Sequence, residues 1–290
     1  QPWSSGLVID SMSSVTSSRP LDGIRVIGLE QYMAGPYCTM LLADAGAEVI
    51  KIERPGTGDP RRAMPPFAKG DGKKKASGFM GYNRNKKSLA LNLRQPEGKK
   101  IFQKLTASAD VVVENLRPGS MAKQGLGFKD MQALNKKLIW AVISGFGQMD
   151  GYRGPYSDRP AFDIVAEAMG GIMDMVGFAD KPPSWTIYGM ADIYSGQVAA
   201  YGVMQALFMR ERTGEGQLVD SSMFDNMIAL NEAQIALYSV AKQVNTRGEP
   251  KNAWPRDAYK CSDGWVAINV PDNIIWARMT ETIGHPELKD

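Results

Sequence analysis

The stretch Ile24-Arg25-Val26-Ile27-Gly28-Leu29 decides the fold, because it is an apolar run with the length of a buried strand. Residues 36–45 follow it with a helical pattern, and Pro36 stands near the first turn, where its missing N–H has no helical partner. Val49-Ile50-Lys51-Ile52 is the next apolar run. A strand, a helix and a second strand in this order are typical of a parallel sheet.

The same alternation continues after a Gly-, Pro- and Lys-rich loop that is expected to end near Lys87. A helix is expected from Pro96, with Ile101 and Leu105 on one apolar face at i, i+4 spacing. Two further buried strands are expected at residues 111–113 and 138–144. We therefore predict an α/β fold, a doubly wound parallel sheet with helices on both faces.

Beyond Gly151 the pattern becomes helical. Helices are expected at residues 162–169, 195–212 and 220–244, and the second is apolar nearly all round, which favours burial. A polar connector at 248–257 leads to an expected hairpin at 258–270, with its turn at Ser262-Asp263-Gly264.

These patterns divide the chain into three parts. We expect a leader or disordered N-terminus at residues 1–20, with a native start at Met12, and a large α/β domain at 21–225. Residues 226–290 are expected to form a linker helix and the start of a smaller second domain. Because that domain stops after one hairpin and the start of a helix, we expect the physiological chain to continue past residue 290.

Charge and hydropathy argue against several classes of protein. A scattered net charge of +3 does not suggest a nucleic-acid binder, and no apolar run reaches the length of a membrane span. Lys73-Lys74-Lys75 and Lys86-Lys87 are interpreted as solvated loop charges rather than as ligands of a phosphorylated cofactor.

Few residues are available for metal or nicotinamide chemistry. Cys38 and Cys261 fit a reducing cytosol, so a cytoplasmic protein is expected, and the single His285 gives a zinc site or a catalytic triad little to build on. Residues 30–36 lack the G-x-G-x-x-G pattern of dinucleotide-binding domains, and no G-x-x-x-x-G-K-[ST] loop occurs. We predict no metal and no nicotinamide.

Blocks of sequence in a fixed order resemble the family III (CaiB/BaiF) CoA-transferases. The first are Ala34-Gly35-Pro36, residues 42–56 and Gly58-Asp59. The later blocks are Asn85-Lys86-Lys87-Ser88, Leu91-Asn92-Leu93, Pro96-Glu97-Gly98, residues 109–115, Pro118-Gly119, residues 144–147, residues 159–163, Ala191-Asp192, Gly196 and residues 212–217. The resemblance covers nearly all of residues 21–290.

This resemblance implies a formyl-CoA transferase-like enzyme that moves coenzyme A between carboxylic acids and forms an interlocked homodimer. The family's aspartate nucleophile matches Asp192 by position. The family's CoA contacts fall on Met33, Ala34, Arg54, Leu91, Asn92, Leu93, Arg94, Asn115, Leu116, Arg117, Lys123, Ser144, Gly145, Phe146 and Gly147. Some relatives carry arginine at the position of Lys123; lysine keeps the charge but not a bidentate phosphate grip.

The residues themselves are compatible with this chemistry. Arg54 ends a strand, where open α/β sheets place binding crevices, and its guanidinium can bind a phosphate with two hydrogen bonds. The alternative for Arg54 is a surface salt bridge, for example with Asp59. The glycines in residues 144–147 let the backbone approach the pantetheine arm closely; the alternative there is a plain strand-ending turn.

Asp192 precedes the helix expected from Ser195, so one interpretation is an N-cap residue. The functional interpretation is a nucleophile that the helix N-terminus keeps ionised. Attack on an acyl-CoA thioester would give an aspartyl mixed anhydride and then an aspartyl-CoA thioester, with backbone N–H groups of glycine segments stabilising each oxyanion.

Two alternatives to CoA transfer remain in view. The α-methylacyl-CoA racemases of the same superfamily pair their aspartate with a histidine, whose position is taken by Phe162, a residue that cannot carry a proton. A non-catalytic CoA-binding fragment is the other alternative. The donor and acceptor acids are not specified by the sequence.

Overall fold

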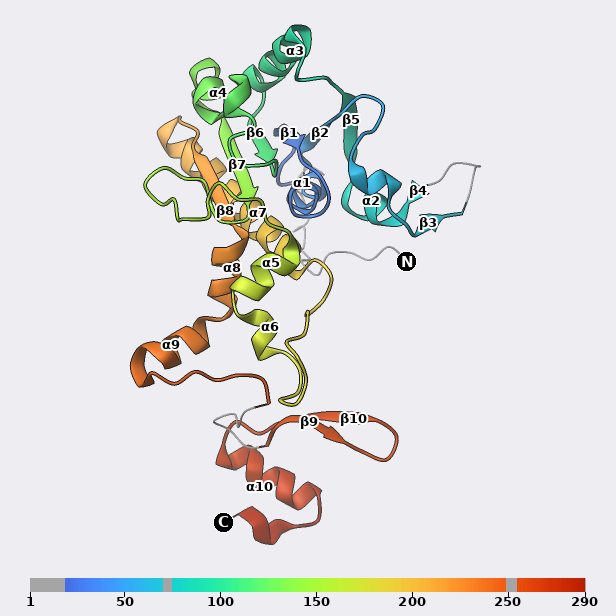
Figure 1. Ribbon diagram of the computed structural model, residues 1–290, viewed down its shortest axis with the longest axis vertical. Coiled ribbons are helices and arrows are strands. Elements are labelled where there is room, and N and C mark those ends of the chain that lie inside the picture. The colour runs from blue at the N-terminus through green and yellow to red at the C-terminus, as the bar shows by residue number, and fades with distance from the viewer. Residues whose placement is uncertain (1–18, 70–74, 249–254, 290) are drawn as a thin grey trace, which may run out of the picture.

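A computed structural model describes residues 19–69, 75–248 and 255–289 (Figure 1). Its centre is a parallel sheet of six strands in the order β5-β2-β1-β6-β7-β8. The strands are β1 (Arg25–Leu29), β2 (Glu48–Glu53), β5 (Lys86–Ala90), β6 (Val111–Glu114), β7 (Ile139–Ser144) and β8 (Leu218–Ser222). The chain builds the sheet outward from β1 in one direction and then in the other, which confirms the predicted doubly wound α/β fold.

The core lies on both faces of the sheet, because successive strand residues point to opposite sides. Val26 and Val111 face the layer formed by α1 (Ala34–Asp44) and α7 (Met190–Thr213). Ile27 and Val112 face the other layer, which contains α3 (Pro96–Ala107) and α4 (Phe128–Leu134). All four of these strand side chains are fully buried.

Two helix predictions are wrong in detail. On α3 the side chain facing the core is Phe102, which is 0% exposed, whereas Ile101 is 44% exposed, because the buried face starts one residue later than the i, i+4 pair suggested. Helix α7 is not buried all round, since Tyr201 and Phe208 are 64% and 63% exposed on one side.

The last sheet strand, β8, was predicted as the beginning of a helix at Asp220. The segment Leu218–Ser222 instead pairs with β7 in parallel, and the helix starts only at Met223. The polar residues of β8 conceal the strand, because Ser221 and Ser222 are buried without being apolar. Helix α8 (Met223–Leu230) is then followed by α9 (Glu232–Ala241), so the predicted single helix is two.

The predicted loop before Lys87 contains short elements and ends earlier than expected. These elements are η1 (Pro60–Ala63), β3 (Phe67–Ala68), β4 (Lys75–Ala76) and α2 (Ser77–Tyr82). The other short elements are η2 (Ala122–Gln124), α5 (Asp163–Met169) and α6 (Ile172–Met175). Lys73, Lys74 and the proposed leader up to residue 18 lie outside the described residues.

The C-terminal part lies apart from the sheet in Figure 1. The predicted hairpin is confirmed as the antiparallel pair β9 (Arg256–Lys260) and β10 (Trp265–Asn269), followed by α10 (Asn273–Thr282) and η3 (Pro286–Lys289). At its turn the N–H of Cys261 donates to the carbonyl of Gly264. Over the described ranges, no helix has the length and apolar character that crossing a membrane requires.

Candidate active site

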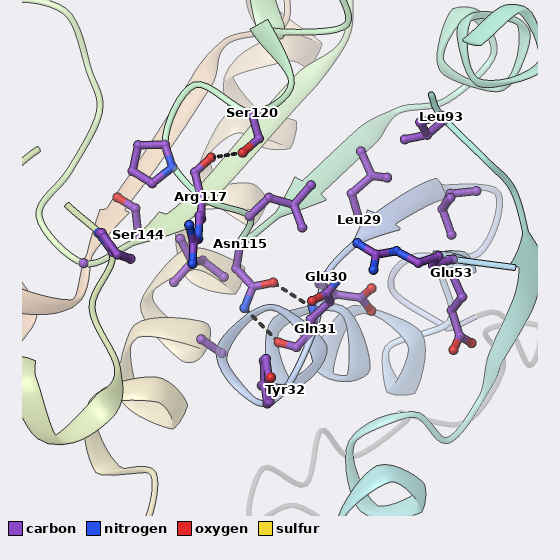
Figure 2. A pocket seen from close by; sticks show the side chains of 18 of the residues that line it. Leu29, Glu30, Gln31, Tyr32, Glu53, Leu93, Asn115, Arg117, Ser120 and Ser144 are labelled. Atoms are coloured by element: carbon purple, nitrogen blue, oxygen red, sulfur yellow. Dashed lines mark hydrogen bonds between the residues drawn. The ribbon is translucent and has the colours of Figure 1, made fainter. Parts of the chain in front are cut away.

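A cavity of about 1000 Å³ opens at the carboxyl ends of the sheet strands. Its wall includes Leu29 at the end of β1, Glu53 at the end of β2 and Ser144 at the end of β7. Between β1 and β6 the chain changes its direction of growth, and open α/β sheets bind ligands at such a switch point. The cavity therefore lies where the fold predicts a ligand site (Figure 2).

Most residues predicted to contact CoA line this cavity, together with the predicted nucleophile. They are Ala34, Arg54, Leu91, Asn92, Leu93, Arg94, Asn115, Leu116, Arg117, Ser144, Gly145 and Asp192. They come from six separate segments of the chain, so only the fold brings them together.

Four predicted contact residues do not line the cavity. Met33 is buried at 3% exposure, and Phe146 packs against Tyr156 and Phe224. Gly147 has a φ of 74° and donates its N–H to Ser144 Oγ at 3.2 Å, so it shapes the turn after β7. Lys123 is exposed on η2, whose neighbour Gln124 does reach the cavity wall.

Three arginines on the wall, Arg54, Arg94 and Arg117, are exposed. Within the described ranges none of the three forms an ion pair with an acidic side chain. The proposed alternative for Arg54 was a salt bridge with Asp59, but Asp59 is buried and pairs with Lys51 Nζ at 2.9 Å. Three guanidinium groups with free donors make this wall suitable for a polyphosphate.

The loop between β1 and α1 forms one side of the cavity, and the Asn115 side chain holds it in place. Asn115 Oδ1 accepts from the N–H of Gln31 at 2.8 Å, and its Nδ2 donates to the Gln31 carbonyl at 2.9 Å (Figure 2). Tyr32 has a φ of 62°, a left-handed conformation that is unfavourable for a tyrosine, and donates its N–H to Asp59. Asn115 is thus a buttress of this loop in addition to a wall residue.

A buried ionic cluster lies beneath the same loop and contains Glu30, Lys51, Asp59 and Lys86. Glu30 pairs with Lys51 and with Lys86, each at 3.1 Å, and Lys51 also pairs with Asp59. The interpretation of Lys86 as a solvated loop charge is wrong: its side chain is 2% exposed, because residue 86 already belongs to β5. Lys87 does match that interpretation, at 70% exposure.

The charges of the cluster balance, and the pKa values reflect this. Burial raises the pKa of Glu30, but Lys51 and Lys86 outweigh it, so the net pKa of Glu30 is lowered. Burial lowers the pKa of Lys86 to about 8, although Glu30 opposes this. Buried ion pairs of this kind keep a particular conformation only while all partners remain.

Glu53 is a second acid beside the cavity that is held by cations. Its two carboxylate oxygens each accept from Arg62 at 2.7 Å, and Ser88 Oγ also donates to it at 2.7 Å. Burial raises the pKa of Glu53, but the hydrogen bonds from Arg62, Ser88 and the Asp59 N–H bring it down to about 2. Glu53 is therefore a structural anion.

Asp192 differs from both of these acids. It is the third residue of α7, whose N-cap is Gly189, so the N-cap interpretation is wrong, and the helix begins five residues before Ser195. Among the described residues nothing donates a hydrogen bond to its carboxylate. Burial and the Asp163 carboxylate raise the pKa of Asp192, Arg61 opposes both, and the net pKa is about 7. The helix N-terminus therefore does not keep the pKa of Asp192 near its ordinary value.

Asp163, the first residue of α5, caps the helix in place of Asp192. Its carboxylate accepts from the N–H groups of Gly189 and Asp192, both at 3.1 Å, and from Trp185 Nε1 at 3.0 Å. Sequence reasoning missed this role, although Asp163 ends a block of the family resemblance. Asp163 fixes the first turn of α7 and places a second negative charge beside Asp192.

Close packing of α1 on α7 sets the position of Asp192 relative to the cavity. A Cβ on Gly196 would lie 2.5 Å from the carbonyl oxygen of Ala34, so only glycine permits this approach. Ala34 lines the cavity and Asp192 stands about one helical turn before Gly196. The two helix starts are therefore in direct backbone contact at the site.

Phe162 is also on the cavity wall, at 69% exposure, with its ring edge-on to that of Tyr32 at 6.4 Å. The racemase alternative requires a proton carrier at this position. His285 lies on the loop before η3 instead, against Glu287. In the part of the chain that the structure describes, no group of three or more His, Cys, Asp or Glu side chains is arranged to hold a metal ion.

Comparison with known proteins shows the family of the chain. The model of CoA-transferase family III matches residues 21–290. The chain is 40% identical over 280 residues to the succinyl-CoA–D-citramalate CoA-transferase of Chloroflexus aurantiacus, covering 96% of this chain and 68% of that protein. It is 41% identical over 272 residues to the succinyl-CoA:mesaconate CoA-transferase of Haloarcula marismortui, covering 92% and 68%.

A solved structure also matches. The crystal structure of a CAIB/BAIF family protein from Brucella suis superposes with a TM-score of 0.82 at 36% identity, covering 94% of this chain and 72% of that one. Sequence and structure thus confirm the predicted resemblance and, with it, acyl-CoA:carboxylate CoA transfer as the class of activity. The chain belongs to CoA-transferase family III.

Proposed function

We propose that this enzyme transfers CoA through a covalent intermediate on Asp192, with CoA in the cavity at the carboxyl edge of the sheet. The observation that carries the proposal is the Asp192 carboxylate: it lines a cavity with three unpaired arginines and accepts no hydrogen bond from the described residues. Arg54, Arg94 and Arg117 are the proposed phosphate ligands. Lys123, which is adjacent in sequence to the wall residue Gln124, is proposed as a further phosphate ligand. Asn115 keeps the β1–α1 loop in shape for the pantetheine arm.

The reaction proceeds in four balanced steps. The Asp192 carboxylate attacks the thioester carbonyl, and CoA leaves as a thiolate, giving an aspartyl-acyl anhydride. The thiolate attacks the aspartyl carbonyl, which releases the donor acid and leaves an aspartyl-CoA thioester. The acceptor carboxylate then displaces CoA to form a new anhydride. The thiolate attacks the acyl carbonyl of that anhydride, which yields the new acyl-CoA and regenerates Asp192.

The environment of Asp192 suits this sequence of steps. A pKa of about 7 makes its carboxylate a stronger base, and hence a stronger nucleophile, than an ordinary aspartate. At neutral pH the Asp192 side chain is ionised in about half of the enzyme molecules. The relatives named above act on succinyl-CoA with citramalate or mesaconate. We therefore propose succinyl-CoA as the donor and a short dicarboxylic acid as the acceptor.

The quaternary and cellular setting is part of the proposal. Exposed apolar side chains on α7, such as Tyr201 and Phe208, and Trp265 on the hairpin support an interlocked homodimer. The division into a large domain at 21–225 and a second domain from 226 follows the separation of the hairpin from the sheet in Figure 1. The free thiols of Cys38 and Cys261 support a cytoplasmic location.

Trapping the intermediate tests the mechanism. With acyl-CoA and no acceptor, hydroxylamine or borohydride should modify the peptide that contains Asp192, as mass spectrometry would detect. Asp192→Asn keeps the shape but removes the nucleophile, so CoA transfer should fall by several orders of magnitude while CoA still binds. Transfer at nearly the parent rate by the Asn variant would mean that the covalent mechanism is wrong.

A further inference from the structure

Two neighbouring arginines on η1, Arg61 and Arg62, have opposite surroundings. Arg62 forms a bidentate ion pair with Glu53, in which Nε and Nη2 each donate to one carboxylate oxygen. Arg61 forms no ion pair with any acid in the described part of the chain, and its Nε is buried without a hydrogen-bond partner. A buried N–H without a hydrogen-bond partner is costly, and an arginine without a paired anion remains available to an anionic ligand.

The Arg61 guanidinium is nevertheless held in a fixed place. It lies against the rings of Tyr82 and Tyr188, with centroid distances of 5.5 and 5.6 Å, and its Nη1 donates to Tyr188 Oη at 3.2 Å. The backbone N–H of Arg61 donates to Asp59 Oδ1 at 2.9 Å, which ties it to the buried ionic cluster. Its other side abuts Gly78, where a Cβ would lie 2.7 Å from Nη2.

The loop that supplies Tyr188 is anchored as well. Trp185 Nε1 donates to both Asp163 and Glu167, and Thr186 Oγ1 donates to Glu167 at 2.7 Å. Trp185 also packs edge-on against Tyr188. The cation and its aromatic cradle are thus pre-organised by buried carboxylates, which reduces the entropy lost when a ligand binds.

Arg61 is close enough to Asp192 to stabilise its charge, yet it does not belong to the CoA cavity wall. In an acyl-CoA whose thioester carbonyl reacts at Asp192, the acyl chain extends from that carbonyl away from the CoA sulfur. A four- or five-carbon dicarboxylic acyl group carries a second carboxylate at the far end of that chain. The Arg61 guanidinium can bind such a carboxylate through charge-assisted hydrogen bonds.

We propose that Arg61, in its cradle of Tyr82 and Tyr188, is the specificity-determining residue that binds the distal carboxylate of a dicarboxylic acyl-CoA and of the acceptor acid. This rests on the proposed function, since it needs the acyl group to be bound to Asp192. Such an interaction would make the site favour dicarboxylic over monocarboxylic acids, because a methyl group in place of the distal carboxylate would leave Arg61 without an anion.

The test is a ratio of two reactions. Succinyl-CoA exchanging with labelled succinate is compared with butyryl-CoA exchanging with labelled butyrate, which replaces the distal carboxylate by a methyl group. The parent enzyme should favour succinyl-CoA in kcat/KM, and Arg61→Gln should reduce that preference by about 10- to 100-fold, the range for losing charged hydrogen bonds. Arg61→Lys should fall between the two.

The control is Arg84→Gln, which removes the same charge from an exposed arginine that pairs with Asp44 and does not line the cavity, and which should leave the ratio unchanged. An unchanged ratio in Arg61→Gln, or a parent enzyme with no preference for succinyl-CoA, would overturn the assignment of Arg61. The Asp192 adduct formed from butyryl-CoA distinguishes this outcome from failure of the mechanism. If the adduct forms in the parent and the ratio does not move, only the role of Arg61 is wrong.

Discussion

The acidic side chains at the cavity fall into two groups with opposite electrostatic surroundings. In one group, Glu30 and Glu53 are surrounded by cations, and both pKa values are lowered. In the other, Asp163 accepts only from neutral N–H groups, and the pKa of Asp192 beside it is raised to about 7. The paired acids thus stabilise the structure of the site, whereas the unpaired Asp192 has a pKa high enough for its carboxylate to be a good nucleophile.

The largest effect is expected from breaking the paired group. Lys51→Met removes a cation that is 1% exposed and leaves the buried acids Glu30 and Asp59 with too little positive charge around them. The free energy of unfolding should therefore fall by about 3 to 5 kcal/mol. Urea denaturation measures this. Lys87→Met is the matched control on the same sheet, because its pair with Glu48 is exposed and should contribute at most about 1 kcal/mol. Equal losses in both variants would contradict the comparison.

An intermediate effect of opposite sign is expected from removing the unpaired acid. The folded pKa of Asp192, about 7, lies above its ordinary value of 3.8, so the ionised carboxylate destabilises the fold above pH 7. Asp192→Asn should therefore stabilise the enzyme by about 1 to 2 kcal/mol at pH 8 while abolishing transfer. The gain should shrink as the pH falls through 7 towards 4. A pH-independent change in denaturation midpoint would argue against a raised pKa.

The smallest effect is a shift of a pH profile. For the parent enzyme, kcat/KM should rise as the pH passes through about 7, because only ionised Asp192 attacks the thioester. Asp163→Asn removes the neighbouring negative charge, which lowers the pKa of Asp192 and moves this rise to lower pH. Steady-state rates between pH 5 and 9 measure the midpoint. If the midpoint stays in place, Asp163 only caps α7 and does not tune the nucleophile.

Much of the fold was readable from local sequence. Strands β1, β6 and β7 are nearly continuous apolar runs, as strands buried on both faces must be, and Gly214 marks the end of α7 with a φ of 73°. Strand β8 was missed because its buried end is polar: Ser221 Oγ donates to the Ser195 carbonyl, a contact that only the folded chain reveals. The prediction for Ile101 was wrong because one apolar i, i+4 pair does not determine which face of α3 is buried.

The site was predictable only where the family resemblance named residues. Asp192 and most of the arginine-bearing wall were expected from it, whereas Asp163 as a cap was not. Arg61 could not be found because its partner Tyr188 is 127 residues away. Lys86 looked like a solvated charge because its lysine neighbours suggested a loop, and its acid partner, Glu30, is 56 residues away. Long-range partners, rather than local pattern, decide whether a charge is structural or functional.

The contact between Gly196 and the Ala34 carbonyl holds the first turns of α1 and α7 closely together. The backbone of Asp192 is therefore held in place relative to the cavity wall at Ala34, and only the Asp192 side-chain torsions can move its carboxylate. A shift of α7 relative to α1 to suit a longer or shorter acid would disrupt this packing. We therefore expect acid specificity to depend on the side chains around the far end of the acyl chain rather than on the spacing of these two helices.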